Sequence, residues 1–275
     1  MQFTKGHGAG NDFVILEDPD GRLALTPELV AALCDRHRGI GGDGVLRVIR
    51  TAKHPDAVGR AADAEWFMDY WNADGSIAEM CGNGVRVFAR YLAGSGLAGT
   101  GSFPILTRAG LVRAVIDGDT IAVDMPTPRL GAAGTATIAQ LTLPGTAVDV
   151  GNPHLVSVLP DSIDLDSLDL TRAPVVDPAL FPAGVNVEFV TPLPPLDGFD
   201  RHVRMRVHER GSGETLACGS GALAVAAVVL HDAGLAVGTV AVDLLGGRLV
   251  ATRGDAGWTL AGPAVLVASG ETTLG

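Results

Sequence analysis

The stretches "MCGNGVRVFARYL" at residues 80–92 and "ACGSGALAVAAVVL" at residues 217–230 share one arrangement. In each, a cysteine is followed by glycine, a small polar residue, a second glycine and an apolar run. The runs are apolar nearly all round, which predicts short helices that are buried inside a protein. Both are much shorter than the ~20 residues that a membrane span requires. A buried helix that begins with a cysteine is therefore predicted twice.

The spacing of the two motifs indicates an internal duplication. Cys81 and Cys218 lie 137 residues apart (218 − 81), about half of the 275-residue chain. Each cysteine is preceded at nine residues by a polar residue, Asn72 or Glu209, and each approach reads as a strand followed by a turn with Gly and Ser. We therefore predict an α/β protein of the α+β type with two pseudo-symmetric lobes, in which a strand-rich, barrel-like sheet surrounds each central helix.

The boundary between the predicted lobes lies near the middle of the chain. We assign residues 1–126 to the N-terminal lobe and residues 127–262 to the C-terminal lobe, and we expect a final strand at 263–275 to return to the first lobe. The segment "PTPRLGAAGT" at residues 126–135 is the best candidate for a linker because it is rich in Pro and Gly. The N-termini of the two helices could then meet in a cleft between the lobes.

Alternation of apolar and polar residues predicts strands in both lobes. The clearest case is "VRMRVHE" at residues 203–209, whose apolar side chains would face a core. The other expected strands cover residues 65–71, 111–117, 120–125 and 239–245. One amphipathic helix is expected at residues 26–37, with Thr26 as the N-cap and Pro27 at the first helical position.

The composition is that of a globular protein without a nucleic-acid partner. Hydrophobic residues make up 47% and charged residues 19% of the chain, and the net charge is -11. Because phosphate binding needs a basic surface, this charge argues against nucleic acids and anionic membranes as partners. The N-terminal "MQFTKGHGAGND" lacks the apolar core of a secretory signal, so we expect a cytoplasmic protein. Three cysteines do not suggest a disulfide framework, and free thiols are expected.

A cysteine at a helix N-terminus is a candidate base. The unpaired N–H groups and the partial positive charge at that end both stabilise a thiolate. The neighbouring glycines let a ligand approach the backbone, and a carboxylate cradle could be formed by Gly82, Asn83, Gly219 and Ser220. One thiolate could remove a proton from a carbon next to that carboxylate while the opposite thiol delivers one to the other face. The pattern predicts inversion of an α-carbon by two bases.

Other motifs give no sign of a metal or a cofactor. "GIGGDG" at residues 39–44 follows a predicted helix end instead of a strand, so we interpret it as a loop. "CDRH" at residues 34–37 has the spacing of only half a zinc site. Lys5 and Lys53 are the only lysines, which is a thin basis for pyridoxal phosphate. We therefore expect neither a metal nor a cofactor.

Some of these features have simpler interpretations. "GHGAGND" at residues 6–12 and "GNPH" at residues 151–154 are typical of turns, although their amides could hold a polar substrate with His154 as the proton partner of a thiol. A lone cysteine beside glycine is more often a small buried hydrophobe than a catalyst, and we interpret Cys34 in this way. The matched pair Cys81 and Cys218 instead favours a catalytic role for these two thiols.

The motifs of the whole chain, taken together, resemble those of the diaminopimelate epimerase family. They are spread in order over nearly all of it: "KGHGAGNDF", "HRGIGGDG", "NADGS", "MCGNG", "GNPH", "GVNVEF", "HERGSGETLACGSG" and "LLGGRL". The resemblance implies a cofactor-independent two-base epimerase that interconverts L,L- and meso-2,6-diaminopimelate in lysine and peptidoglycan precursor synthesis. It also implies two α/β lobes that close on the substrate.

The resemblance further implies roles for particular residues. Cys218 matches the proton acceptor and Cys81 the proton donor in the L,L to meso direction. His154 and Glu209 match residues that tune the thiols, and Glu209 can also hold the ammonium group. The backbone contacts to the reacting carboxylate match Gly82, Asn83, Gly219 and Ser220. The substrate contacts, mainly at the distal amino acid end, match Asn11, Asn72, Asn152, Asn186 and Arg210.

Two positions depart from the family's pattern, and two other interpretations stay open. Gly44 stands where many members have glutamine, so a substrate contact there must be lost or replaced. A tyrosine that supports dimerisation in some members falls at Ala268, and a homodimer is still expected. The alternatives are another two-cysteine racemase of the same fold, acting on proline-like substrates, and a non-catalytic amino acid-binding protein.

Overall fold

Contacts within the chain divide it into two units, each built around one of the cysteine-initiated helices. The structure is a computed structural model that describes residues Met1–Leu274. The first unit consists of Met1–Asp124 together with the returning segment that begins at Gly262, and the second unit is Met125–Ala261. Among residues 1–274, no helix is long and apolar enough to cross a membrane.

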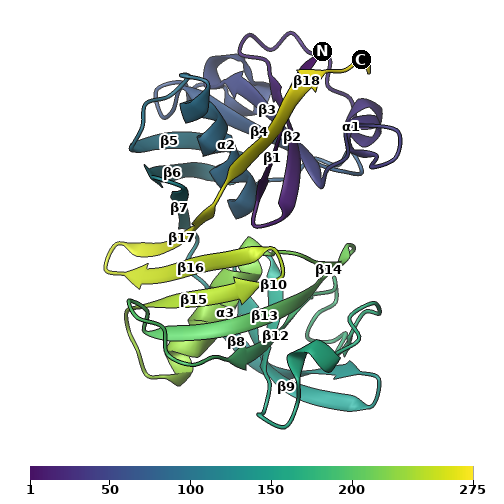
Figure 1. The fold of residues 1–275 in the computed structure, drawn as a ribbon, viewed down its shortest axis with the longest axis vertical. Helices are drawn as coiled ribbons and strands as arrows, with labels where there is room; N and C mark the ends of the chain where they lie inside the picture. The colour runs from purple at the N-terminus through teal and green to yellow at the C-terminus, as the bar shows by residue number, and fades with distance from the viewer. Residues whose placement is uncertain (275) are drawn as a thin grey trace. The chain divides into compact units, whose positions relative to one another are not determined.

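One sheet runs through the first unit. Its strands are β1 (Gln2–Gly8), β2 (Asn11–Glu17), β3 (Gly44–Arg50), β4 (Trp66–Asn72), β5 (Ser102–Thr107), β6 (Gly110–Asp117), β7 (Thr120–Met125) and β18 (Val265–Glu271). They pair in the order β18, β1, β2, β3, β4, β5, β6, β7, parallel at β2–β3 and β4–β5 and antiparallel elsewhere. Figure 1 shows β18, in yellow, beside β1, so the end of the chain completes this sheet.

The second unit repeats that pattern of pairing. Its strands are β8 (Arg129–Ile138), β9 (Leu141–Asp149), β10 (Pro153–Val158), β11 (Val175–Val176), β12 (Asn186–Pro192), β13 (Arg201–Glu209), β14 (Gly213–Thr215), β15 (Gly238–Leu244), β16 (Gly247–Gly254) and β17 (Gly257–Pro263). The order is β8, β9, β10, β12, β13, β15, β16, β17, parallel at β10–β12 and β13–β15. Parallel and antiparallel pairs thus follow one another in the same sequence in both units, as the predicted repeat requires.

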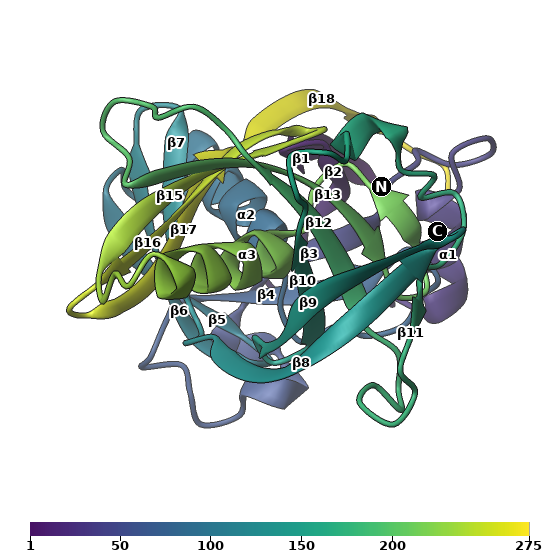
Figure 2. The same ribbon diagram turned by 90° about the horizontal axis from the view of Figure 1, so that it is seen from below.

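Each sheet curves around one helix. In the first unit, α2 (Gly82–Gly94) packs against β1, β2, β3, β4, β6 and β18, and 10 of its 13 residues are buried. In the second unit, α3 (Gly219–Asp232) packs against β9, β10, β12, β13, β15 and β16, and Figure 2 shows it lying among them. These helices are buried on nearly all sides because their sequences are apolar on nearly all sides.

The short elements agree with the sequence in part. The expected strands at residues 65–71, 111–117, 120–125, 203–209 and 239–245 are confirmed within two residues. The N-cap Thr26 is also confirmed, but the helix predicted at 26–37 ends early, since α1 is Pro27–Cys34. It ends because the Asp35 carboxylate accepts the backbone N–H groups two and three residues further on, at 2.8 and 2.9 Å. Such local side-chain bonds compete with helical pairing.

The expectation of a linker at residues 126–135 is wrong. Strand β8 begins at Arg129 and pairs with β9. Gly134 makes room for the core of the second unit, because a Cβ added there would lie 2.9 Å from Leu180 and 3.3 Å from Leu155. This glycine, part of the pattern that suggested a linker, therefore reflects close packing.

A tight turn sets the position of Asn11, one of the candidate site residues. Gly8 pairs with Asn11 across Ala9 and Gly10, whose φ angles are 52° and 83°. Positive φ at both central residues is the geometry of a type I′ hairpin turn. The motif at residues 6–12 is thus a turn, as expected, and it starts β2 at Asn11.

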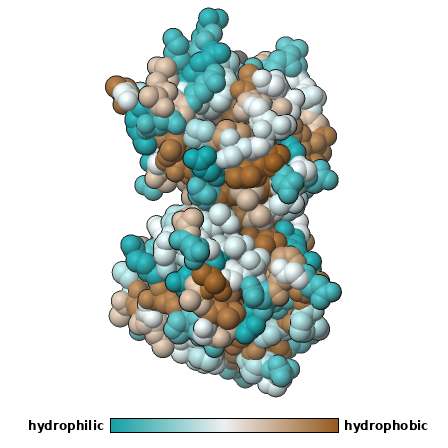
Figure 3. All heavy atoms as spheres, turned by 90° about the vertical axis from the view of Figure 1, so that its left-hand side faces the viewer, coloured by the Kyte–Doolittle hydropathy of each residue, from teal (hydrophilic) through white to brown (hydrophobic). Residues whose placement is uncertain are grey.

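Exposed hydrophobic side chains are scattered over both units. On the face that Figure 3 shows, brown hydrophobic residues are interspersed with polar ones in each unit. The most exposed large hydrophobic residues, Val58, Val175 and Val267, come from separate segments and are 83%, 70% and 60% exposed. Isolated exposed residues such as Val58 and Val175 are normal in folded domains.

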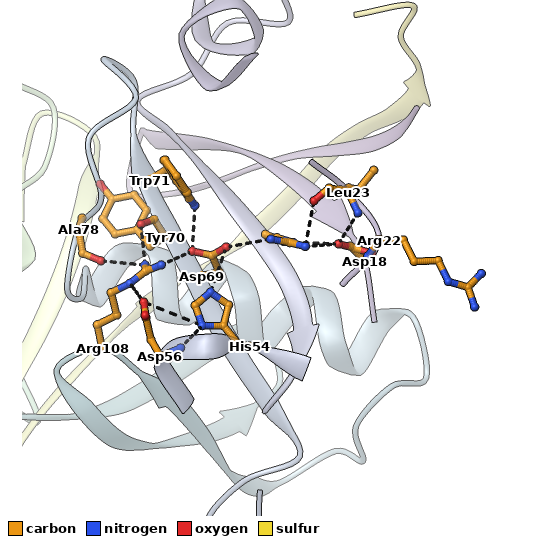
Figure 4. Close-up of polar contacts among 11 residues, drawn as sticks. Asp18, Arg22, Leu23, His54, Asp56, Asp69, Tyr70, Trp71, Ala78 and Arg108 are labelled. Atoms are coloured by element: carbon orange, nitrogen blue, oxygen red, sulfur yellow. Dashed lines mark hydrogen bonds and ion pairs between the residues drawn. The ribbon is translucent and has the colours of Figure 1, made fainter. Parts of the chain in front are cut away.

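A buried carboxylate anchors the outer face of the first sheet (Figure 4). Asp69, on β4, is 1% exposed, and its Oδ1 accepts hydrogen bonds from Trp71 Nε1 at 2.8 Å and Arg108 Nη2 at 2.6 Å. Its Oδ2 lies 3.5 Å from His54 Nε2 and 3.6 Å from Arg47 Nη1. Burial alone would raise the pKa of Asp69, but the contacts with His54 and Arg108 outweigh it and lower that pKa below its usual range.

The same network holds the segment that leads to Cys81. Arg108 Nη1 donates to the backbone carbonyls of Tyr70 at 3.2 Å and Ala78 at 3.4 Å. Since Asp69 fixes Arg108, the turn after β4 is tied to the sheet just before α2 begins.

Replacing Asp69 with Asn should lower the free energy of unfolding by about 3 kcal/mol, because it leaves buried cations without their counter-charge. Chemical denaturation at pH 7 measures this loss. The pKa of Asp69 is lowered in the folded state, so its stabilisation is present above the ordinary carboxyl pKa and is lost as pH falls through the lowered value. The difference between the two proteins should therefore shrink in acid.

The control is Asp63→Asn, which breaks an exposed ion pair with Arg60. It should cost less than about 0.5 kcal/mol. Equal losses in the two variants would contradict the role assigned to Asp69.

Candidate active site

Each buried helix begins with a cysteine whose sulfur caps it. Cys81 Sγ accepts the backbone N–H of Gly84 at 3.5 Å, and Cys218 Sγ accepts that of Gly221 at 3.4 Å. Both cysteines have the extended backbone of an N-cap residue. Each sulfur thus lies at the positive end of a helix, where a thiolate is stabilised.

The residues after each cysteine form the first turn of its helix. Gly82 and Asn83 begin α2, and Gly219 and Ser220 begin α3. Their N–H groups have no carbonyl partner within the helix, because the first turn of any helix lacks one. Each unit therefore presents neighbouring amides that suit an anion such as a carboxylate.

In the first unit, Asn11 connects Cys81 to its surroundings. Asn11 Oδ1 accepts the Cys81 thiol at 3.6 Å and the Asn83 side-chain amide at 3.3 Å, while its Nδ2 donates to Asp43 at 2.7 Å. Asn83 Oδ1 accepts in turn from Arg86 Nη2 at 2.6 Å. The structure thus brings Asn11, Cys81 and Asn83 together, and it adds a fully buried arginine behind them.

In the second unit, a chain of polar contacts ends at Cys218. His154 Nε2 lies 3.0 Å from Asn152 Oδ1, and Asn152 Nδ2 donates to Ser220 Oγ at 3.4 Å. Ser220 Oγ lies 3.6 Å from Cys218 Sγ. At the other end, His154 Nδ1 lies 2.7 Å from Glu188 Oε1. His154 therefore reaches the thiol through two intermediate side chains.

The contacts of His154 restrict where its protons lie. Because Asn152 Nδ2 donates to Ser220, its Oδ1 faces His154, and His154 Nε2 carries a hydrogen. At its other nitrogen, His154 Nδ1 lies within hydrogen-bond distance of Glu188 Oε1, at 2.7 Å in a buried pair. Burial raises the pKa of Glu188, and the adjacent His154 opposes this rise.

The surroundings of Cys218 favour the protonated thiol. Burial raises the pKa of Cys218 well above its ordinary value, and the carboxylates of Glu209 and Glu188 raise it further. The hydroxyl of Ser220 and the N–H of Gly221 oppose this shift. Cys218 therefore becomes a strong base whenever it loses its proton.

Three more candidate residues meet where β12 begins and β13 ends. The backbone N–H of Arg210 donates to Asn186 Oδ1 at 2.9 Å. Glu209 Oε1 accepts a hydrogen bond from Thr215 Oγ1. Asn186 also pairs in register with His154 across β10 and β12. Asn186, Glu209 and Arg210 thus share the end of the sheet that carries His154.

Asn72 lies at the corresponding end of the first sheet. Its Nδ2 donates to Ser76 Oγ at 3.0 Å, and it pairs in register with Gly44 across β3 and β4. A Cβ on Gly44 would lie 2.4 Å from the carbonyl oxygen of Trp71, so a side chain at this position requires the backbone to move. Gly44 itself therefore supplies no side-chain contact at this position.

Cys34 has a different environment from the other two cysteines. It lies at the end of α1, in a core cluster with Val14, Leu33 and Val45. Burial raises its pKa to about 11, as suits a structural residue. Within residues 1–274, no group of three or more His, Cys, Asp or Glu side chains is arranged to hold a metal ion.

Sequence reasoning overlooked Arg86 and Glu188. Both are fully buried, and both join the polar contacts that lead to a cysteine. The available signal was a charged residue inside an apolar segment, in "VRVFARYL" for Arg86 and in "NVEFV" for Glu188. Burial of such a residue requires partners, and those depend on the tertiary fold.

Comparison with known proteins agrees with this geometry. The family described as Diaminopimelate epimerase matches residues 3–131 and 146–273. The diaminopimelate epimerase of Streptomyces coelicolor is 51% identical, covering 98% of this chain and 95% of the relative. That of Corynebacterium glutamicum (strain ATCC 13032) is 48% identical, covering 100% of this chain and 99% of the relative.

Solved structures share the fold at low identity. A phenazine biosynthesis protein of the PhzF family from Bacillus anthracis superposes with a TM-score of 0.70 at 16% identity, covering 99% of this chain and 98% of that one. A hydroxyproline epimerase from Agrobacterium vitis gives a TM-score of 0.65 at 14% identity, covering 99% and 90%. At this low identity, these likenesses support the two-lobed α/β architecture alone. The relatives named above match nearly the full length of the chain at about half of its positions. The chain belongs to the diaminopimelate epimerase family.

Proposed function

We propose that this isomerase interconverts L,L- and meso-2,6-diaminopimelate, with Cys81 and Cys218 as its acid–base pair. The observation that carries the proposal is the sulfur-capped helix, which occurs in both units of a chain that belongs to the epimerase family. A thiolate at a helix N-terminus can take a proton from an α-carbon, and a second thiol can return one to the opposite face. We assign the reaction to lysine and peptidoglycan precursor synthesis, in the cytoplasm.

The proton transfers use one thiolate and one thiol. In the L,L to meso direction, the Cys218 thiolate accepts the α-proton, and the electron pair of the broken C–H bond delocalises into the carboxylate. The Cys81 thiol then delivers its proton to the other face of the same carbon, which inverts it. The enzyme ends with Cys218 protonated and Cys81 as the thiolate, and loss of the Cys218 proton to water with uptake of a proton at Cys81 restores the first state. The proposed cycle needs no cofactor.

Stabilisation of the carbanion falls to the helix N-termini. The backbone amides proposed to bind the reacting carboxylate are those of Gly82, Asn83, Gly219 and Ser220. Their N–H groups and the two helix dipoles oppose the charge that develops as the α-proton leaves. Proton transfer by a positioned base supplies about 10²- to 10⁴-fold, so the rest of the acceleration must come from this cradle and from positioning.

The remaining candidate residues would bind the rest of the substrate. Glu209 suits the ammonium group, and the Arg210 guanidinium can bind the distal carboxylate with two parallel hydrogen bonds. The side-chain contacts proposed at the distal end are those of Asn11, Asn72, Asn152, Asn186 and Arg210. His154 and Glu209 are proposed to tune the thiols.

Incubating the reduced enzyme with L,L-diaminopimelate in D2O should place deuterium at one α-carbon and form the meso isomer. Mass spectrometry and chiral separation measure both results. Cys81→Ala and Cys218→Ala should each lower epimerisation by roughly 10²- to 10⁴-fold, because each removes one proton-transfer group. Substrate binding without deuterium exchange in the unmodified enzyme would instead favour an amino acid-binding protein.

A substrate panel should separate this activity from that of a racemase for proline-like substrates. L,L-Diaminopimelate should be turned over, while proline and an analogue that lacks the distal amino acid group should not. The physical reason is that buried polar groups left unpaired by a shortened substrate cost binding energy in the transition state. Turnover of proline at a comparable kcat/KM would refute the proposed substrate.

We also propose that the chain forms a homodimer. The supporting feature is β18, where Val265 and Val267 are 45% and 60% exposed. Light scattering should give twice the 28.2 kDa chain mass, and Val267→Glu should shift the population towards monomer, because a charge inside an apolar interface is costly. The control is Val58→Glu, which places the same charge on an exposed loop and should leave the mass unchanged. Thr259→Glu would not serve, because Thr259 is half-buried on β17 and the charge could disturb the fold. A monomeric wild-type protein at micromolar concentration would rule the dimer out.

A further inference from the structure

The first turns of α2 and α3 lie at equivalent positions in the two units, and the residues packed against them can be compared. Gly84 and Gly221 each lie three residues after the capping cysteine. A Cβ on Gly84 would lie 3.4 Å from Leu46 and 3.6 Å from Phe13. Those two residues come from β3 and β2, so apolar side chains back the first turn of α2.

In the second unit, the ionisable residues His154 and Glu188 occupy the same two places. Phe13 is in register with Gly44, and Leu46 lies two residues further along β3. His154 is likewise in register with Asn186, and Glu188 lies two residues further along β12. A Cβ on Gly221 would accordingly lie 2.7 Å from Glu188 Oε1.

Glu188 is a carboxylate with unusual surroundings. It is 0% exposed, its Oε1 lies 2.7 Å from His154 Nδ1, and its Oε2 has no hydrogen-bond partner within residues 1–274. Together with the Cβ distance to Gly221, these contacts place its carboxylate against the first turn of α3. That is the turn that Cys218 caps.

Cys81 has the opposite charge behind it. Arg86 lies five residues after Cys81, and the residue five after Cys218 is Leu223. Arg86 is 0% exposed, and its Nη atoms donate to Gly82 O at 3.2 Å and Asn83 Oδ1 at 2.6 Å. In the described part of the chain, its Nε has no hydrogen-bond partner. Both acceptors are neutral and belong to the first turn of α2.

We propose that Arg86 and Glu188 are positioning residues that decide which cysteine holds the proton in the resting enzyme, with the thiolate at Cys81 and the thiol at Cys218. This inference rests on the proposed function, because it assigns starting states to the same acid–base pair. With the roles given above, the resting enzyme is poised to accept the α-proton of the meso isomer at Cys81.

The other charges near the two thiols fit this assignment. Around Cys218, Glu209 on β13 adds a second carboxylate, and His154 on β10 is paired with Glu188. Burial lowers the pKa of Arg86 to about 10, which leaves it charged at neutral pH, and a negative Cys81 opposes that lowering.

Several charged side chains near α2 have partners of their own. Asp43, which Asn11 contacts, bonds to Arg36 at 2.8 Å, and Lys5 on β1 pairs with Asp12 on β2 at 2.6 Å. Glu17 on β2 binds the hydroxyl of Tyr91, in the last turns of α2. The Asn11 carbonyl accepts a hydrogen bond from the Cys81 thiol at 3.6 Å, which favours the protonated form, whereas the buried cation Arg86 favours the thiolate.

Alkylation of the reduced, substrate-free enzyme tests the assignment. Iodoacetamide labelling across a pH series, with each cysteine quantified by peptide mass spectrometry, gives a midpoint pH for Cys81 and for Cys218. The midpoint reports thiolate formation, whereas accessibility changes only the limiting rate. Cys81 should titrate at the lower pH, and thiolate absorbance near 240 nm in Cys81→Ser and Cys218→Ser provides a second measurement that does not depend on access.

Two substitutions should move the midpoints in opposite directions. Arg86→Leu, which installs the residue found at the matching place in the second unit, should raise the Cys81 midpoint by about one pH unit. Arg86→Lys keeps the charge and should leave it nearly in place. Glu188→Gln should lower the Cys218 midpoint by about one pH unit. Each change should spare the other cysteine.

The inference is overturned if Cys218 titrates before Cys81 in the unsubstituted enzyme, or if Glu188→Gln leaves the Cys218 midpoint where it was. Both results are available even if Arg86→Leu fails to fold. Since no diaminopimelate enters the assay, a reversed order would leave the proposed epimerase reaction standing. Conversely, failure of deuterium exchange would leave the measured midpoints unaffected.

Discussion

The sulfur-to-amide cap at the start of each buried helix is the contact on which both half-sites depend. A helix that begins inside a protein leaves N–H groups that water cannot reach, so its first turn must find acceptors within the fold. Here the acceptor is a thiol sulfur, at 3.5 Å in α2 and 3.4 Å in α3. Oxygen side chains are the usual N-caps, so sulfur in both copies indicates that chemistry as well as capping selected the residue.

The two units share a framework and differ in the charges placed on it. Their strands pair in the same sequence of parallel and antiparallel contacts. In each unit an asparagine joins the polar contacts that reach the cysteine: Asn11, at the start of β2, in the first unit and Asn152, just before β10, in the second. The framework fixes where the sulfurs lie in each unit, and we propose that single substitutions within it separate the acidities of the two thiols.

Sequence patterns were sufficient for the repeat, the strands and the capped helices because these depend on local periodicity and on residues near one another in the chain. They failed where packing decided the outcome, as at residues 126–135, where Gly134 is small because Leu180 lies against it. Glu188 was overlooked for a related reason. Its contact with His154 joins residues 34 positions apart, through the register of two parallel strands that no local pattern specifies.

The complete burial of Arg86 indicates that its charge has a functional role. Its hydrogen bonds go to neutral oxygens, and among residues 1–274 the charge that opposes its desolvation comes from Cys81 and from no carboxylate. Replacing a buried charge with an apolar residue of similar volume is often neutral or stabilising, and the second unit carries leucine at the matching place. The fold can therefore accommodate an apolar residue there. A charge kept at such a cost one turn beyond Cys81 is best explained by the thiolate that it would stabilise.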